Sequence, residues 1–188
     1  MNKLSFQLTL SLMIVSLIVG LAAGYYISPS YQQTMYIKDD MGLGQADRFV
    51  DLRYINQMAA HHRGAILLAD QIALKTKRTE IKELSVAIQT GEPKLIEELY
   101  GWKKDWYKDN RKVADPIVAN LGPSDEKVDL RFLNALIAHH EAGIKMTQEI
   151  RSKSSRKEVL ENADAVEAFL SGSITTLKEW RKQWFKVN

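Results

Sequence analysis

Residues 51–62 read DLRYINQMAAHH, and residues 129–140 read DLRFLNALIAHH. The second stretch repeats the first at a spacing of 78 residues, and the alignment needs no gap. It extends to two tryptophans near the end of each copy, Trp102 and Trp106 in the first and Trp180 and Trp184 in the second. A period this long that occurs twice indicates a duplicated half of one domain, because solenoid arrays repeat shorter units more often.

The His-His sequences lie in the first of two predicted helices in each copy. Apolar residues recur at helical spacing over residues 47–75 and 125–152, and they define a broad buried face. Asp47 and Asp125 stand at the starts of these helices. Both are predicted N-caps, because a short side-chain oxygen there accepts a free backbone N–H.

A second amphipathic helix follows in each copy, at roughly 79–110 and 156–186. Gly91 and Pro93 interrupt the first of these helices, and the Ser-Gly-Ser sequence at 171–173 interrupts the second. Since proline and glycine weaken helix interiors, a kink or break is predicted in the same region of both.

Together these helices predict an all-α fold, a ferritin-like four-helix bundle made of two repeated hairpins. Each hairpin has apolar stripes that need a partner, and a bundle buries them most simply. The bundle is expected over residues 46–188, with repeat one at 46–110, a linker at 111–124 and repeat two at 125–188.

The N-terminal residues 1–27 are interpreted as a membrane anchor or signal segment. Residues 4–27 contain no charged side chain, and a membrane-spanning helix needs about 20 apolar residues. Signal peptides usually have a shorter apolar core of about 7–15 residues, so an uncleaved transmembrane helix is favoured. The small residues in Gly20-Leu21-Ala22 leave cleavage open.

Residues 28–45 are predicted to tether the bundle to this segment. Lys3 is the only charge in residues 1–27, and the positive-inside rule then keeps the N-terminus in the cytoplasm. The bundle is therefore expected on the periplasmic or extracellular side of the cytoplasmic membrane. Ser16, Gly20 and Gly24 are spaced four apart, a pattern that would allow a homodimer of the single-pass anchor.

The composition excludes several classes of site. The chain has no cysteine, which removes disulfides, cysteine-zinc sites, iron–sulfur clusters and thiol catalysis. Its net charge of +3 is too balanced to indicate nucleic-acid binding. The Glu-x-x-His motif of di-iron bundles and the His-Glu-x-x-His motif of zinc proteases are both absent from the sequence.

The candidate metal ligands are the four histidines of the chain, all in the two pairs: His61, His62, His139 and His140. On a helical wheel, each of them falls inside the apolar arc of its helix. The repeat therefore predicts that imidazoles from both halves converge in the bundle core. Because neutral imidazole is the commonest metal ligand, a metal site is the favoured interpretation.

Two methionines extend this predicted set. Met58 lies one turn before the first pair and between its two histidine directions, whereas Met146 lies two turns after His139. Thioether and imidazole donors together favour copper, especially Cu(I), over magnesium, calcium or manganese.

The leading hypothesis is a non-enzymatic protein that binds copper for sequestration or handover. The alternative is a structural or protein-interaction bundle in which the histidines form a buried polar network without metal, since buried histidines and methionines are often core residues. A metal-dependent redox enzyme is a third and weaker possibility.

The sequence also resembles a known family. Met58-Ala59-Ala60-His61-His62, followed by Ala65 and by a second helix that ends in tryptophans, resembles the domain-of-unknown-function 305 family over about residues 46–186. The resemblance implies a ferritin-like four-helix fold and, for exported members, an association with copper. By position it assigns the family's paired histidines to those of this chain, and its methionines to Met58 and Met146.

The chain departs from the family pattern in its second helices. About ten and seven residues before the tryptophan, the family usually has a Gln and a Glu. This chain has Glu92 and Leu95 there in copy one, and Leu170 and Ser173 in copy two. The usual carboxylate is therefore expected to be missing from both halves, and the methionines are half depleted. Compared with the family's methionine-rich members, the resemblance then predicts copper binding that is weaker or lost.

Overall fold

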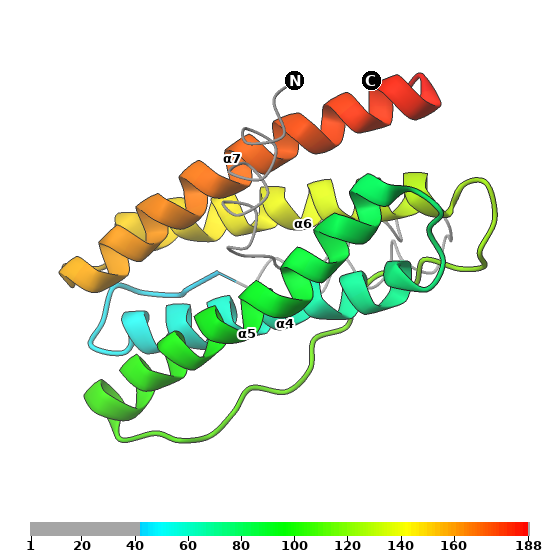
Figure 1. The fold of residues 1–188 in the computed structure, drawn as a ribbon. Coiled ribbons are helices and arrows are strands. Elements are labelled where there is room, and N and C mark those ends of the chain that lie inside the picture. The colour runs from blue at the N-terminus through cyan, green and yellow to red at the C-terminus, as the bar shows by residue number, and fades with distance from the viewer. Residues whose placement is uncertain (1–41, 188) are drawn as a thin grey trace, which may run out of the picture.

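The structure is a computed structural model, and it describes residues 42–187. This part of the chain contains no strand and folds into four helices, which are α4 (Val50–Ala73), α5 (Thr79–Tyr107), α6 (Val128–Arg151) and α7 (Lys157–Phe185). α4 and α5 form one hairpin, α6 and α7 form the other, and α4 packs on α6 between them (Figure 1). The prediction of an all-α bundle is confirmed.

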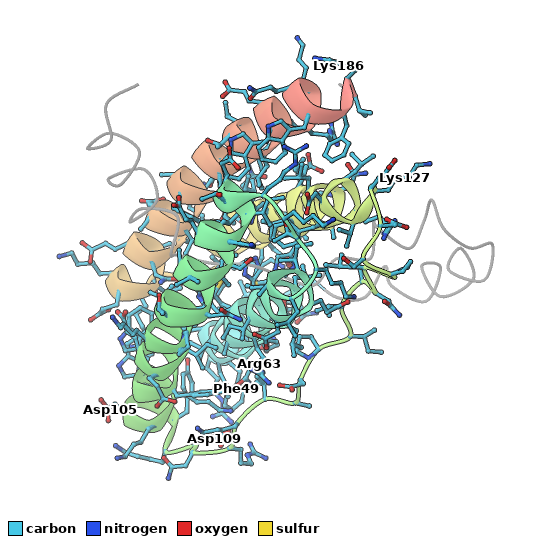
Figure 2. The ribbon with its side chains drawn as sticks, turned by 45° about the vertical axis from the view of Figure 1, so that its right-hand side comes forward. Phe49, Arg63, Asp105, Asp109, Lys127 and Lys186 are labelled. Atoms are coloured by element: carbon cyan, nitrogen blue, oxygen red, sulfur yellow. The ribbon has the colours of Figure 1, made fainter. Side chains whose placement is uncertain are left out.

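The ends of the helices show how the hairpins are arranged. Lys127 before α6 and Lys186 after α7 lie at one end of the molecule, whereas Asp105 near the end of α5 lies at the other (Figures 1 and 2). The connection between the hairpins runs alongside the bundle. Arg63 of α4 forms an ion pair with Asp115 of this connection, with 2.6 Å between Nε and Oδ1.

The first helix of each hairpin begins three residues later than predicted, so Asp47 and Asp125 are not its N-caps. Each aspartate instead closes the turn before the helix. The carboxylate of Asp47 accepts the N–H of Phe49 at 2.8 Å, and that of Asp125 accepts the N–H of Lys127 at 2.9 Å. Such a local bond competes with helix formation, and it delays the first helical turn.

The second helices run without a break, so of the predicted kink or break only a kink is compatible with them. α5 and α7 are each continuous over 29 residues, although Pro93 lies inside α5. The proline removes one backbone hydrogen bond, but burial of the apolar stripe stabilises the helix on both sides of it. Both helices end on a left-handed residue, Lys108 with φ 54° and Lys186 with φ 58°.

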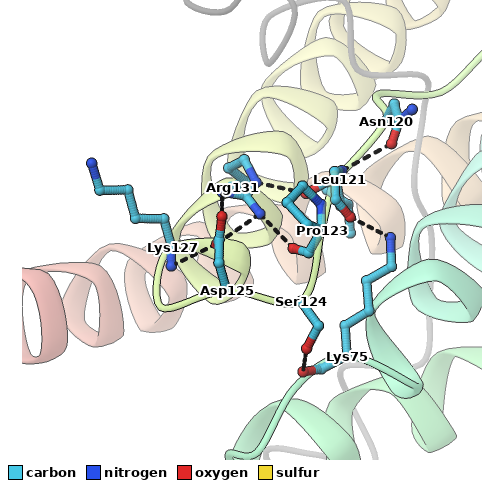
Figure 3. Close-up of polar contacts among 9 residues, drawn as sticks. Lys75, Asn120, Leu121, Pro123, Ser124, Asp125, Lys127 and Arg131 are labelled. Carbon is cyan, nitrogen blue, oxygen red and sulfur yellow. Dashed lines mark hydrogen bonds and ion pairs between the residues drawn. The ribbon is translucent and has the colours of Figure 1, made fainter.

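The segment before each first helix packs on the opposite hairpin. Before α6, Leu121 is fully buried, and its N–H donates to Oε1 of Gln71 on α4 at 3.0 Å. Arg131 donates through Nε to the carbonyl of Leu121 at 2.6 Å (Figure 3). The same contacts are made before α4 by the repeat-equivalent residues Leu43, Glu149 and Arg53.

A second pair of reciprocal contacts joins the hairpins near the helix ends. Arg78 pairs with Asp129 of α6 at 3.3 Å, and its guanidinium lies 4.2 Å from the ring centroid of Trp184. The equivalent contacts measure 3.2 Å and 4.1 Å, and they join Arg156, Asp51 and Trp106. Since each copy supplies the partner of the other, the bundle has the pseudo-twofold symmetry that the sequence repeat predicts.

The core consists of two apolar halves with a polar layer between them. One half combines the C-terminal part of α4 with the N-terminal part of α6. The other half combines the N-terminal part of α4 with the C-terminal part of α6. The pseudo-twofold exchanges the two halves. The buried polar side chains of the layer between them are His61, His62, Glu92, His139, His140 and Ser173.

Among the helices of residues 42–187, none is long and apolar enough to cross a membrane. The predicted anchor at 1–27, with its proposed dimer face at Ser16, Gly20 and Gly24, lies outside the described residues. So does most of the predicted tether.

Candidate metal centre

The four predicted histidines lie at the middle of the bundle. His61 and His62 on α4 are 0% and 1% exposed, and His139 and His140 on α6 are 0% and 2% exposed. They are buried because each falls on the apolar face of its helix, and because α4 and α6 pack against each other.

The imidazole rings of the two copies meet in this layer. The ring centroids of His61 and His139 are 5.0 Å apart, and the rings are stacked with an angle of 22° between their planes. His62 lies edge-on to His61 at 5.7 Å, and His140 lies 6.4 Å from His139. The structure thus brings together imidazoles from both halves.

Gly143 of α6 provides the space that the ring of His61 occupies. A Cβ at this position would lie 2.3 Å from Nε2 of His61 and 2.6 Å from Cδ1 of Leu170. A larger residue therefore does not fit while His61 stays in place. The first copy has Ala65 at the equivalent position, so the copies differ at the point where the rings meet.

Glu92 of α5 is a member of the site that the sequence analysis missed. Its side chain is fully buried, and its Oε2 lies 2.5 Å from Nδ1 of His62. A buried carboxylate is costly unless it is paired, and the imidazole N–H provides that partner. The family's usual carboxylate position in the first half is Leu95, and Glu92 supplies a carboxylate from the position three residues earlier.

Ser173 of α7 is the hydrogen-bond partner of a histidine in the second half, although its repeat-equivalent is Leu95. Its Oγ lies 2.8 Å from Nε2 of His140, and Leu170 occupies the position equivalent to Glu92. A sequence signal for both missed residues exists, since each is a polar side chain on an otherwise apolar stripe. Glu92 follows Ile88 by one turn, and Ser173 precedes Leu177 by one turn.

Burial keeps two of the imidazoles neutral. It lowers the pKa of His61 well below the usual range, and the neighbouring His139 adds to this effect. Burial also lowers the pKa of His140 to about 3. Both ring nitrogens of His61 and Nδ1 of His140 are buried without a hydrogen-bond partner. A neutral imidazole has one nitrogen lone pair, and a metal can bind it without displacing a proton.

The two predicted methionine ligands lie in the same half of the core. Met58 is fully buried and Met146 is 8% exposed, and both belong to the half that also contains Leu43 and Tyr54. Their repeat-equivalents, Leu136 and Leu68, both lie in the other half. The pseudo-twofold therefore places two thioethers on one side of the histidine layer and two leucines on the other.

The donor set offered by the histidines and the methionine half consists of imidazole nitrogens and thioethers, which are donors that soft metal ions accept. Within residues 42–187, no three His, Asp or Glu side chains are grouped as ready-made ligands for one ion. Structural zinc takes four such ligands in a closed site, whereas Cu(I) accepts imidazole and thioether donors in low coordination numbers. The unpartnered nitrogens of His61, three residues after Met58, are donors of this kind.

Comparison with known proteins gives structural neighbours but no curated relative. No curated protein matches the chain. CopM in the Cu(I)-bound form is 26% identical, with a TM-score of 0.64 over 72% of this chain and 97% of CopM. CopM in the Ag-bound form obtained by co-crystallization is 25% identical, with a TM-score of 0.64 over the same shares. A DUF305 fragment from Deinococcus radiodurans, 18% identical, has the same fold, with a TM-score of 0.62 over 71% of this chain and 95% of the fragment.

The family model confirms the resemblance seen in the sequence. It matches the chain twice, over residues 51–128 and 129–188; the first match covers the first hairpin and the connection after it, and the second covers the second hairpin. The chain belongs to the family described as Domain of unknown function (DUF305).

Proposed function

We propose that this chain is an extracytoplasmic copper-binding protein, held at the outer face of the cytoplasmic membrane by its N-terminal segment. In this proposal it binds Cu(I) through the paired histidines together with Met58 or Met146, for sequestration or handover. A catalytic role is not part of the proposal.

The single observation that carries the proposal is the unpartnered state of His61. Two buried ring nitrogens without a hydrogen bond are costly to the fold, and an ion bound at the lone pair of the neutral ring would satisfy one of them. The depressed pKa of His61 supports the same conclusion, since a neutral imidazole is ready to bind.

The comparisons support copper as the ion. CopM, which has this fold and is about a quarter identical, is described in Cu(I)-bound and Ag-bound forms. Ag(I) is also a soft monovalent ion, so both forms agree with a site of imidazole and thioether donors.

One observation favours the alternative of a metal-free structural network. His62 and His140 each have a hydrogen-bond partner, Glu92 and Ser173, as expected for buried polar side chains that only stabilise the core. This network leaves His61 unexplained, and we therefore rank it second.

Titration of the full-length protein in detergent with Cu(I), Cu(II) and Zn(II) tests the proposal. We expect stoichiometric Cu(I) binding that is lost when His61→Ala and His139→Ala are combined. Unchanged stoichiometry in this double variant would remove the proposed site.

A second double variant, Met58→Leu with Met146→Leu, gives the methionine half the residues that the other half already has. Leucine and methionine have similar volumes, so we expect a stability change below about 1.5 kcal/mol. Weaker Cu(I) binding with an unchanged melting temperature would support thioether ligation. Unchanged Cu(I) affinity would restrict the site to the histidines.

A further inference from the structure

The two halves of the histidine layer hold their imidazoles by different nitrogens. Glu92 contacts Nδ1 of His62 at 2.5 Å, whereas Ser173 contacts Nε2 of His140 at 2.8 Å. The helices are related by the repeat, but these partners are not, because Glu92 corresponds to Leu170 and Ser173 corresponds to Leu95. The pseudo-equivalent rings of His62 and His140 are therefore held through different nitrogens, by partners at non-equivalent positions.

The chemical nature of each partner determines what the imidazole can do. An ionised carboxylate only accepts hydrogen bonds, so Glu92 requires a proton on Nδ1 of His62 and leaves the lone pair on Nε2. A hydroxyl can donate or accept, so Ser173 does not by itself fix the tautomer of His140. It does occupy Nε2, and the nitrogen left without a partner in the core is Nδ1.

We propose that Glu92 is a positioning residue which makes His62 bind the metal through Nε2, while His140 binds through Nδ1. This inference rests on the proposed copper function. A carboxylate that accepts from the far nitrogen of a ligating histidine fixes the ring orientation and raises the basicity of the ligand. The half that contains Glu92 therefore provides the stronger imidazole donor.

The burial of Glu92 adds an electrostatic reason. Among the described residues, it is the only buried carboxylate at the level of the histidines. Its carboxylate contacts a proposed ligand of the cation, and in its ionised form it would compensate the charge of a monovalent ion in this buried region. The second half, with Leu170 and Ser173, offers a dipole but no compensating charge.

The test uses Ag(I) as the probe, because it is diamagnetic and its nuclei have spin one-half. The full-length protein, labelled with ¹⁵N-histidine in detergent, is titrated with Ag(I), and silver–nitrogen couplings identify the bound nitrogen of each ring. Single His→Gln variants assign the signals. We expect coupling at Nε2 of His62 and at Nδ1 of His140, and a proton on Nδ1 of His62 before Ag(I) is added.

Two variants of Glu92 and two controls complete the experiment. Glu92→Gln keeps the shape but can donate as well as accept, and Glu92→Leu reproduces the second half; both should lower Ag(I) affinity by about 10–100-fold. Ser173→Ala should leave the His62 signals unchanged, because it acts on the other half. Glu97→Gln, which changes an exposed carboxylate of the same helix, should leave both the affinity and the signals unchanged.

The outcomes separate this inference from the proposed function. Coupling at Nδ1 of His62 in the unmodified protein would overturn the inference without needing any variant. Unchanged affinity together with unchanged His62 signals in Glu92→Gln would also overturn it, although Ag(I) binding would still support the proposed function. Absence of Ag(I) binding to every histidine of the unmodified protein would remove the proposed function itself.

Discussion

Replacing Gly143 by alanine tests whether the ring of His61 packs against α6. The new Cβ would lie 2.3 Å from Nε2 of His61 and 2.6 Å from Cδ1 of Leu170, both far inside ordinary contact distance. The ring of His61 cannot easily withdraw, because it stacks on His139 with 5.0 Å between centroids. Both neighbours must therefore shift to admit one methyl group.

The size of the effect follows from two opposing terms. Overpacking of a dense core costs about 1–3 kcal/mol. Alanine in place of glycine inside a helix stabilises by about 1 kcal/mol. Gly172→Ala is the matched control, because Gly172 lies inside α7 and nothing is within 4 Å of its added Cβ. It retains only the favourable term, so we expect Gly143→Ala to be less stable than Gly172→Ala by about 1–3 kcal/mol.

Urea denaturation of the metal-free protein, followed by circular dichroism, measures both free energies of unfolding. The slopes of the two curves must agree for the comparison to hold, since a changed slope indicates a changed unfolded or native state. If Gly143→Ala is as stable as Gly172→Ala, the close approach of His61 to α6 is wrong. The convergence of the two histidine pairs would then be wrong as well.

Three further predictions concern the stability of the metal-free protein. Leu43→Ala should lower the free energy of unfolding in urea by about 2–5 kcal/mol, because Leu43 is fully buried. A much smaller decrease would show that the segment before α4 does not pack on α6. Arg78→Ala and Arg156→Ala should each lower the free energy of unfolding by about 1–3 kcal/mol. Strongly unequal decreases would contradict the reciprocal contacts. His61 and His140 have lowered pKa values in the fold, so the unfolded chain binds protons first as the pH falls. Unfolding free energies measured from about pH 6.5 to about 5 should therefore fall by up to about 1.4 kcal/mol per pH unit for each of them, and His140→Gln should flatten the slope.

The fold could be predicted from the repeat, because the repeat contains long-range information. Two gapless copies with the same apolar faces require a symmetric arrangement, and the reciprocal contacts of Arg78 and Arg156 confirm it. The helix starts were less predictable. Whether Asp47 caps a helix or closes the preceding turn depends on which N–H its carboxylate reaches, and periodicity does not contain that information.

The candidate site was predicted in its histidines but not in their partners. Helical wheels place His61 and His139 toward the core because that direction depends only on their own helices. Glu92 and Ser173 lie on α5 and α7, so their contacts depend on how far these helices rotate and slide against α4 and α6. The family pattern did not identify Glu92 as a partner of His62. It places the usual carboxylate at position 95, whereas this chain has its carboxylate at position 92.

The methionines show why a pattern within one copy can mislead. In the sequence, each copy has only one methionine of the predicted pair. Leu136 stands at the position equivalent to Met58, and Leu68 stands at the position equivalent to Met146. Within one copy, the site therefore looks depleted in thioethers. In the bundle, the pseudo-twofold exchanges the two halves of the core. Both leucines therefore lie in one half, and both methionines lie together in the other half. We therefore expect one Cu(I) per chain and not two. Leu68→Met combined with Leu136→Met would create the missing thioether pair at little cost in packing, and it should raise the Cu(I) stoichiometry; an unmodified protein that already binds two Cu(I) ions with equal affinity would refute this reasoning.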